Sequence, residues 1–402
     1  MEKKEEINPS YTARSLSGAI SWPGDCYWGK AAVSRAVKAA GKRLRHPLII
    51  TDSAAWGASA AVVTHALAAT LDHKCQIFDG VVPNPSLGPV KAALQMARDS
   101  ACESIIAVGG GSVIDVAKVV LGCLSSGLQP EELATPSGQA WLDAATEPDD
   151  FLLFAIPTTS GTGSESSSAA LIQGEDGRKH LYRSLRTRPA LVALQPEFTL
   201  SLPFSATAQG GFDAVLHALG AWVNTDPSPI GKAVALQALG ICMQALPAVL
   251  DKPDSLSARA DMQMGAYLAG VAIGISKVDA VHAMCTPLES RVKMPHAEVL
   301  APVFRVVSRF TVQTHAHEYA NAARQLNIAN TCNDHEAALL LIGQVEQLAR
   351  HARISLRFTN LCLTEQDADL LAELALQSAS MPINPRPLTH QQISSLYLQM
   401  VA

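Results

Sequence analysis

The stretch SIIAVGGGSVIDVAK, residues 104–118, decides the class of fold. Its short apolar start is typical of a buried strand, and the residues from about Ser112 onward have the composition of a helix. Between them stand Gly109, Gly110 and Gly111, which let the backbone turn sharply and approach a ligand closely. The start of the following helix favours a phosphate group. The loop is not a GxGxxG fingerprint, and a plain strand–helix turn is the alternative.

Similar apolar runs flank this unit on both sides. We predict strands in HPLIITD (46–52), KCQIFDGV (74–81), FLLFAIPTT (151–159) and ALVALQP (190–196), with helices at 57–71, through Met96 and at 112–124. Strands that alternate with helices predict a mainly parallel sheet. From about Ala206 onward, long segments rich in Ala and Leu predict helices. We therefore expect an α/β dinucleotide-binding domain over 1–203 and an all-helical, metal-binding domain over 204–402.

Composition narrows the class of protein. The 402 residues are 48% hydrophobic and 17% charged, which is typical of a globular chain. The net charge of −5 and the absence of a long basic run argue against nucleic acid as a partner. The charged start MEKKEEINPS does not resemble a secretory signal, and no run of 18 apolar residues predicts a membrane span. The eight scattered cysteines form no CxxC pair, so we expect reduced thiols in the cytoplasm.

Four potential metal ligands lie in the second half. Asp213 and His217 are four residues apart, a spacing that places both on one face of a helix. His282 and His296 follow in later segments. One carboxylate and three imidazoles suit a borderline divalent metal such as Fe(II) or Zn(II). The alternative is that each histidine is an ordinary core residue.

Two further features suggest a dinucleotide ligand. Asp52 ends the first predicted strand, where a carboxylate accepts hydrogen bonds from the ribose of NAD and repels the 2′-phosphate of NADP. Equally, Asp52 suits the N-cap of the next helix. The loop IPTTSGTGSE (156–165) offers short hydroxyl donors, among them Thr158, Thr159 and Thr162.

Together, these motifs resemble the iron-containing (group III) alcohol dehydrogenase family. The matching motifs are VVPNPS (81–86), GGGSVIDVAK (109–118), PTTSGTGSE (157–165) and NPRPLT (384–389). The resemblance implies hydride transfer between NAD(H) and a small aldehyde or alcohol, assisted by Fe(II) or, as second choice, Zn(II). It also implies a homodimer or larger homo-oligomer. The implied metal ligands are Asp213, His217, His282 and His296. The implied cofactor-binding residues are Asp52, Asn84, Gly109, Gly110, Gly111, Ser112, Asp115, Thr158, Thr159, Thr162 and Lys179.

The sequence departs from the family pattern near the ligands. Thr286 stands where a second histidine is common, and we count it as a catalytic candidate beside the four ligands. Gly220, Ala297 and Gln195 also differ from the usual residues. None of these changes removes a ligand, so we expect an unusual substrate or weak activity on short alcohols. The alternatives are a lyase similar to dehydroquinate synthase, which uses NAD and a metal, and a catalytically retired binding protein.

Overall fold

The computed structural model describes most of the chain in nine ranges. These are residues 22–69, 75–134, 151–175, 177, 179–225, 228–292, 294–330, 333–359 and 361–401. Two predictions concern residues outside these ranges. They are the interpretation of residues 1–10 as unlike a secretory signal, and the last two residues of the helix predicted to end at Leu71.

A six-stranded sheet forms the centre of the first half, in the order β1-β8-β5-β4-β2-β3, and every pairing in it is parallel. Five strands lie within the segments where the sequence predicts one: β2 (Pro47–Thr51), β3 (Gln76–Phe78), β4 (Ser104–Gly109), β5 (Leu152–Pro157) and β8 (Leu191–Leu194). The edge strand β1 (Asp25–Trp28) was not predicted. The structure thus confirms the mainly parallel sheet.

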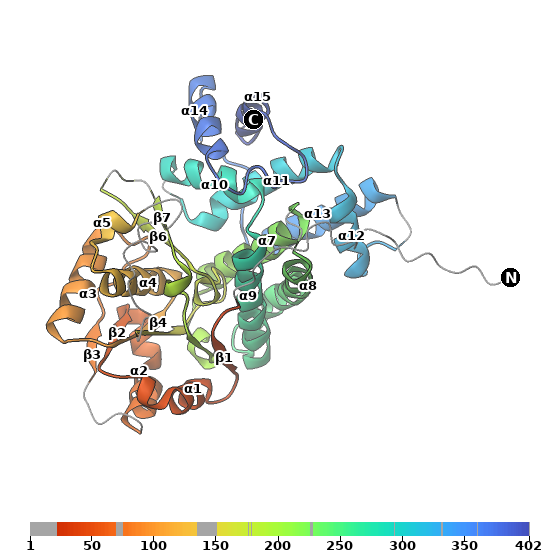
Figure 1. Cartoon of the computed structure of the whole chain (residues 1–402). Helices are drawn as coiled ribbons and strands as arrows, with labels where there is room; N and C mark the ends of the chain where they lie inside the picture. The colour runs from red at the N-terminus through yellow and green to blue at the C-terminus, as the bar shows by residue number, and fades with distance from the viewer. Residues whose placement is uncertain are drawn as a thin grey trace.

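Helices cover both faces of this sheet (Figure 1). Neighbouring residues of a strand point to opposite faces, so Ile105 packs with α3 (Leu87–Asp99) and α4 (Gly111–Ser126). Its neighbour Ile106 packs instead with α1 (Ala32–Ala40) and α2 (Ser53–Ala68). Burial on both faces explains why these strands are continuous apolar runs. A short helix, α5 (Pro130–Leu133), follows α4.

A small antiparallel hairpin was missed by the sequence analysis. Strands β6 (Ala169–Gln173) and β7 (Lys179–Arg183) form it, and it packs against α4. Along β6, buried side chains alternate with more exposed ones, and its five residues are too few to distinguish a strand from a loop in the sequence. In Figure 1 the hairpin lies on the side of the sheet domain that faces α10.

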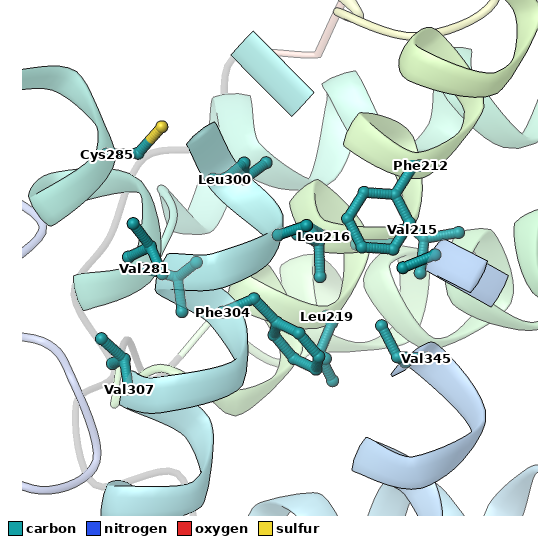
Figure 2. Packing of buried hydrophobic residues seen from close by; sticks show 14 of the residues in the cluster. Phe212, Val215, Leu216, Leu219, Val281, Cys285, Leu300, Phe304, Val307 and Val345 are labelled. Atoms are coloured by element: carbon teal, nitrogen blue, oxygen red, sulfur yellow. The ribbon is translucent and has the colours of Figure 1, made fainter. Parts of the chain in front are cut away.

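In the described residues of the second half, helices are the only regular secondary structure. It comprises α7 (Phe204–Val223), α8 (Pro229–Asp251), α9 (Leu256–Ser276), α10 (Ala280–Arg291), α11 (His296–Val312), α12 (His317–Gln325), α13 (Asp334–His351), α14 (Glu365–Leu376) and α15 (His390–Gln399). Figure 2 shows side chains of α7, such as Leu216 and Leu219, packed with Phe304 of α11. The helical composition is confirmed, whereas the domain boundary after residue 203 stays a prediction.

Helix α8 is long and apolar enough to cross a membrane by length and composition alone. In the structure it packs closely against α7 and α9, and residues such as Leu239, Cys242 and Leu246 are fully buried. This packing is typical of a core helix in a globular protein.

Candidate metal and dinucleotide site

The four predicted ligands converge on one point. The Oδ1 atom of Asp213 lies 3.5 Å from the Nε2 atom of His217 and 3.7 Å from that of His282. The Nε2 atom of His296 lies 3.5 Å from the same oxygen. The residues come from three helices, α7, α10 and α11, so only the tertiary fold brings them together.

The donor set fits a divalent cation. Distances of 3.5 Å and more are too long for good hydrogen bonds, and the buried Oδ1 of Asp213 and Nε2 of His282 have no hydrogen-bond partner. Burial lowers the pKa of His217 to about 4, so its ring is neutral and able to donate a lone pair. Burial opposes the ionised form of Asp213, but the nearby histidines hold its pKa well below the usual range. Buried oxygen and nitrogen atoms without a hydrogen-bond partner need another partner, and a metal ion would provide one.

The capping residue of α10 lies close to His282. Asp279 caps the helix, because its Oδ1 accepts a hydrogen bond from the backbone N–H of Val281 (3.1 Å). The same oxygen lies 3.9 Å from the Nδ1 of His282. A Cβ at Gly220 would lie only 3.1 Å from it, so glycine at 220 leaves room for this carboxylate. This departure from the family pattern therefore has a structural reason.

His296 has partners that the sequence analysis missed. Its Nδ1 lies 3.0 Å from Oε2 of Glu289 and 3.7 Å from Sγ of Cys285. Burial raises the pKa of Glu289, but its hydrogen bonds with His296 and Lys179 lower it on balance, so Glu289 is ionised. A signal was present in the sequence, because Glu289 stands seven residues after His282 and hence on the same helix face.

Thr286 lies on the exposed side of α10. Its hydroxyl donates to the carbonyl oxygen of His282, 3.1 Å away within the same helix. In this conformation the hydroxyl proton of Thr286 is therefore engaged in a hydrogen bond within the helix. Its assignment as a catalytic residue stays a prediction.

The predicted dinucleotide loops lie side by side at the carboxyl edge of the sheet. The N–H of Thr158 donates to the carbonyl of Gly109 (3.1 Å), which joins the ends of β5 and β4. A Cβ at Gly110 would lie 3.2 Å from Thr159, and one at Gly111 would lie 2.6 Å from the hydroxyl of Thr162. Glycine is required at 111 for this close approach. Ser112 lies in the first turn of α4, whose exposed N–H groups are suited to a phosphate.

The remaining predicted cofactor residues surround the same edge. Asp52 is the N-cap of α2, and its Oδ1 accepts from the N–H groups of Ala54 (3.0 Å) and Ala55 (2.9 Å). Asn84 adopts a left-handed conformation (φ 51°) in the VVPNPS turn. That turn contacts β6, whose Gln173 pairs with Lys179 of β7. The structure thus groups these residues at one edge, and their cofactor roles stay predictions.

Asp115 ties α4 to the neighbouring loop. One oxygen accepts from the hydroxyl of Ser164 (2.5 Å), and the other accepts from the N–H of Leu171 (2.9 Å). Fully buried Lys118 donates to Ser164 (2.8 Å) and to the carbonyl of Ala169 (2.6 Å). Burial lowers the pKa of Lys118 to about 8. Asp115 therefore contacts protein groups at both oxygens, and its predicted cofactor contact is untested.

The loop 158–166 packs backbone to backbone on two helices of the second half. A Cβ at Gly161 would lie 2.6 Å from the Cα of Gly210 in α7, three residues before Asp213. A Cβ at Gly163, whose φ is +63°, would overlap the Cα of Gly270 in α9. These glycine contacts bring the predicted dinucleotide loop next to the helix that carries two of the candidate metal ligands.

Comparisons with known proteins agree with this geometry. The model of the iron-containing alcohol dehydrogenase family matches residues 23–196, and its C-terminal domain model matches residues 207–401. The chain belongs to the iron-containing alcohol dehydrogenase family. As in other members of this family, its activity is that of an alcohol oxidoreductase, and the lyase and retired-protein alternatives are not favoured.

Individual relatives and solved structures show the extent of the likeness. Alcohol dehydrogenase 4 of Schizosaccharomyces pombe is 29% identical over 372 residues, which are 91% of this chain and 84% of the yeast protein. The crystal structure of a 1,3-propanediol oxidoreductase superposes with a TM-score of 0.85 at 26% identity, over 95% of this chain and 100% of the other. A sulfoacetaldehyde reductase from Bifidobacterium kashiwanohense, in complex with NAD+, has the same fold (TM-score 0.84, 21% identity, 96% and 100% coverage).

Proposed function

We propose that this alcohol oxidoreductase transfers hydride between NAD(H) and a small alcohol or aldehyde at a site between its glycine loop and its four-ligand cluster. The observation that carries the proposal is the convergence of Asp213, His217, His282 and His296 on one point with unpaired buried donors. Loop 158–166 contacts α7 beside these ligands, which supports a shared site for cofactor and metal.

Each group has a separate task in this proposal. Asp213, His217, His282 and His296 would hold the divalent metal, which when bound supplies Lewis-acid polarisation of a carbonyl oxygen. Gly110, Gly111 and Ser112 would receive the pyrophosphate, and the bound nicotinamide supplies the hydride chemistry. Thr158 and Thr162 would orient the dinucleotide by hydrogen bonds. The likeness in fold to the Bifidobacterium reductase, whose structure holds NAD+, supports the choice of cofactor.

The direct test measures NADH oxidation by Fe(II)-loaded protein, prepared anaerobically, with a panel of aldehydes. The panel covers neutral, hydroxylated, carboxylated, phosphonylated and sulfonylated compounds. We expect turnover of at least one class, lost on chelation and restored by the metal, because the carbonyl needs polarisation. Well-folded, metal-loaded protein that turns over no aldehyde and oxidises no alcohol would contradict the proposed function.

Asp52 predicts a preference for NADH over NADPH. The variant Asp52→Asn keeps the capping oxygen of α2 but removes the charge that repels a 2′-phosphate. We expect the ratio of kcat/KM with NADH to kcat/KM with NADPH to fall on the order of tenfold. This corresponds to about 1.4 kcal/mol of discrimination between the two cofactors. The measurement is steady-state kinetics with both cofactors at one ionic strength. A wild-type protein that uses NADPH at least as well as NADH would refute this role.

The finer assignments complete the proposal. We propose Fe(II) as the resident metal because of the family, although the same ligands suit Zn(II). Metal analysis of protein purified without added metal distinguishes the two. The homodimer and the cytoplasmic location remain predictions, of which the first is tested by light scattering coupled to size-exclusion chromatography.

A further inference from the structure

Glu289 contacts both halves of the molecule at once. It lies on α10, and only 8% of its side chain is exposed. Its Oε1 accepts a hydrogen bond from Lys179 of the β6–β7 hairpin, at 2.6 Å. Its Oε2 lies 3.0 Å from Nδ1 of His296, at the start of α11. One carboxylate thus connects a lysine of the sheet domain with a candidate metal ligand of the helical domain.

The contact has a chemical consequence for His296. Its Nε2 is the nitrogen that lies 3.5 Å from Asp213 in the ligand cluster, so Nδ1 is the outer nitrogen. A carboxylate at Nδ1 favours the tautomer with its proton there, because only an N–H donates to Glu289. That tautomer leaves the lone pair of Nε2 directed at the cluster. A carboxylate behind a histidine also increases its basicity as a ligand.

Lys179 completes the arrangement. Its side chain is 21% exposed, and its ammonium balances the charge of Glu289. The lysine contacts Oε1 of the carboxylate, while Oε2 contacts His296. Cys285, 3.7 Å from Nδ1, is a weaker acceptor and cannot substitute for a carboxylate.

We propose that Glu289 is a positioning residue that holds His296 in its metal-binding orientation, and that Lys179 acts through Glu289 on the affinity for the metal. This inference rests on the proposed function, since it takes His296 as a metal ligand. It adds a residue from the sheet domain to the determinants of metal binding.

The test measures metal affinity rather than turnover. Metal-free full-length protein is titrated with Co(II), whose visible absorption reports the ligand geometry, and the Zn(II) Kd is obtained by competition with a chelating dye. The variants are Glu289→Gln, Lys179→Met and the double variant. The control is Arg291→Met, which breaks the 2.7 Å ion pair between Arg291 of α10 and Asp367 without touching a ligand.

We expect Glu289→Gln to weaken metal binding by about 10- to 100-fold and to shift the Co(II) bands. Lys179→Met should weaken binding less, and it should add nothing in the Glu289→Gln background, because both act through one contact. Arg291→Met should bind metal as the wild type does.

Three outcomes overturn the inference. In the first, Glu289→Gln binds metal as tightly as the wild type. In the second, Arg291→Met loses as much metal affinity as Glu289→Gln. In the third, the wild type binds a second equivalent of metal that Glu289→Gln loses, which would make Glu289 a ligand of another ion. If the wild type binds no metal at all, the proposed function fails instead, so the two failures are distinguishable.

Discussion

The variant His282→Ala is expected to lose bound metal and alcohol dehydrogenase activity together. The ring of His282 stacks on that of His217, with centroids 4.8 Å apart, and lies 6.0 Å from the ring of His296; His282 is 8% exposed. Its removal leaves three donors and an open space among them. We expect kcat/KM to fall on the order of 10³-fold or more, because the carbonyl would lose the charge stabilisation that a metal supplies.

Two measurements check this prediction. Metal content per chain is determined after dialysis against metal-free buffer, and kcat/KM is determined with the best aldehyde of the panel. The control is His351→Ala. His351 pairs with Asp251, and neither residue is one of the four candidate ligands. That variant should keep both metal and activity. A His282→Ala protein that reduces aldehyde without bound metal would refute the Lewis-acid mechanism.

The variant Gly163→Ala is expected to destabilise the fold strongly. Gly163 has a φ of +63°, and an added Cβ would overlap the backbone of Gly270 in α9. The atoms that the new Cβ would meet belong to the backbone and not to a flexible side chain, so loop 158–166 or α9 must shift. We expect the free energy of unfolding to fall by about 3 kcal/mol or more, from backbone strain and overpacking together. Urea unfolding followed by circular dichroism measures the effect.

A second glycine separates the two contributions. Gly127, which ends α4, also has a positive φ (+74°), but an added Cβ would meet no atom within 4 Å. Gly127→Ala should therefore cost only the conformational part, about 1–2 kcal/mol. Equal losses for the two variants would show that the contact with Gly270 is not tight.

The sequence predicts the sheet well where strands are buried on both faces. Continuous apolar runs such as those of β4 and β5 are visible without any structure, because both faces need apolar side chains. The hairpin β6–β7 and the edge strand β1 were missed because each strand has only four or five residues and is not continuously buried. Trp28 of β1 is 61% exposed and Leu171 of β6 is 40% exposed, and segments this short give no periodic pattern that separates a strand from a loop.

The candidate site could be predicted only in part. The helical spacing of Asp213 and His217 is local, and the sequence shows it directly. The contact between Lys179 and Glu289 joins residues 110 positions apart, and no local pattern indicates such a pair. Asp52 shows a third situation, since the structure confirms its role as N-cap of α2 while its role toward NAD stays a prediction.

The buried tie of Asp115 and Lys118 to Ser164 limits how the protein can be redesigned. A glycine loop taken from another dehydrogenase, in order to change cofactor choice, would bring its own first helical turns with it. Unless those turns carried an aspartate and a lysine in register, the buried hydroxyl of Ser164 would lose its hydrogen-bond partners, and the N–H of Leu171 would lose its acceptor. The smallest exchangeable unit is therefore the glycine loop together with 158–171, transplanted as one piece.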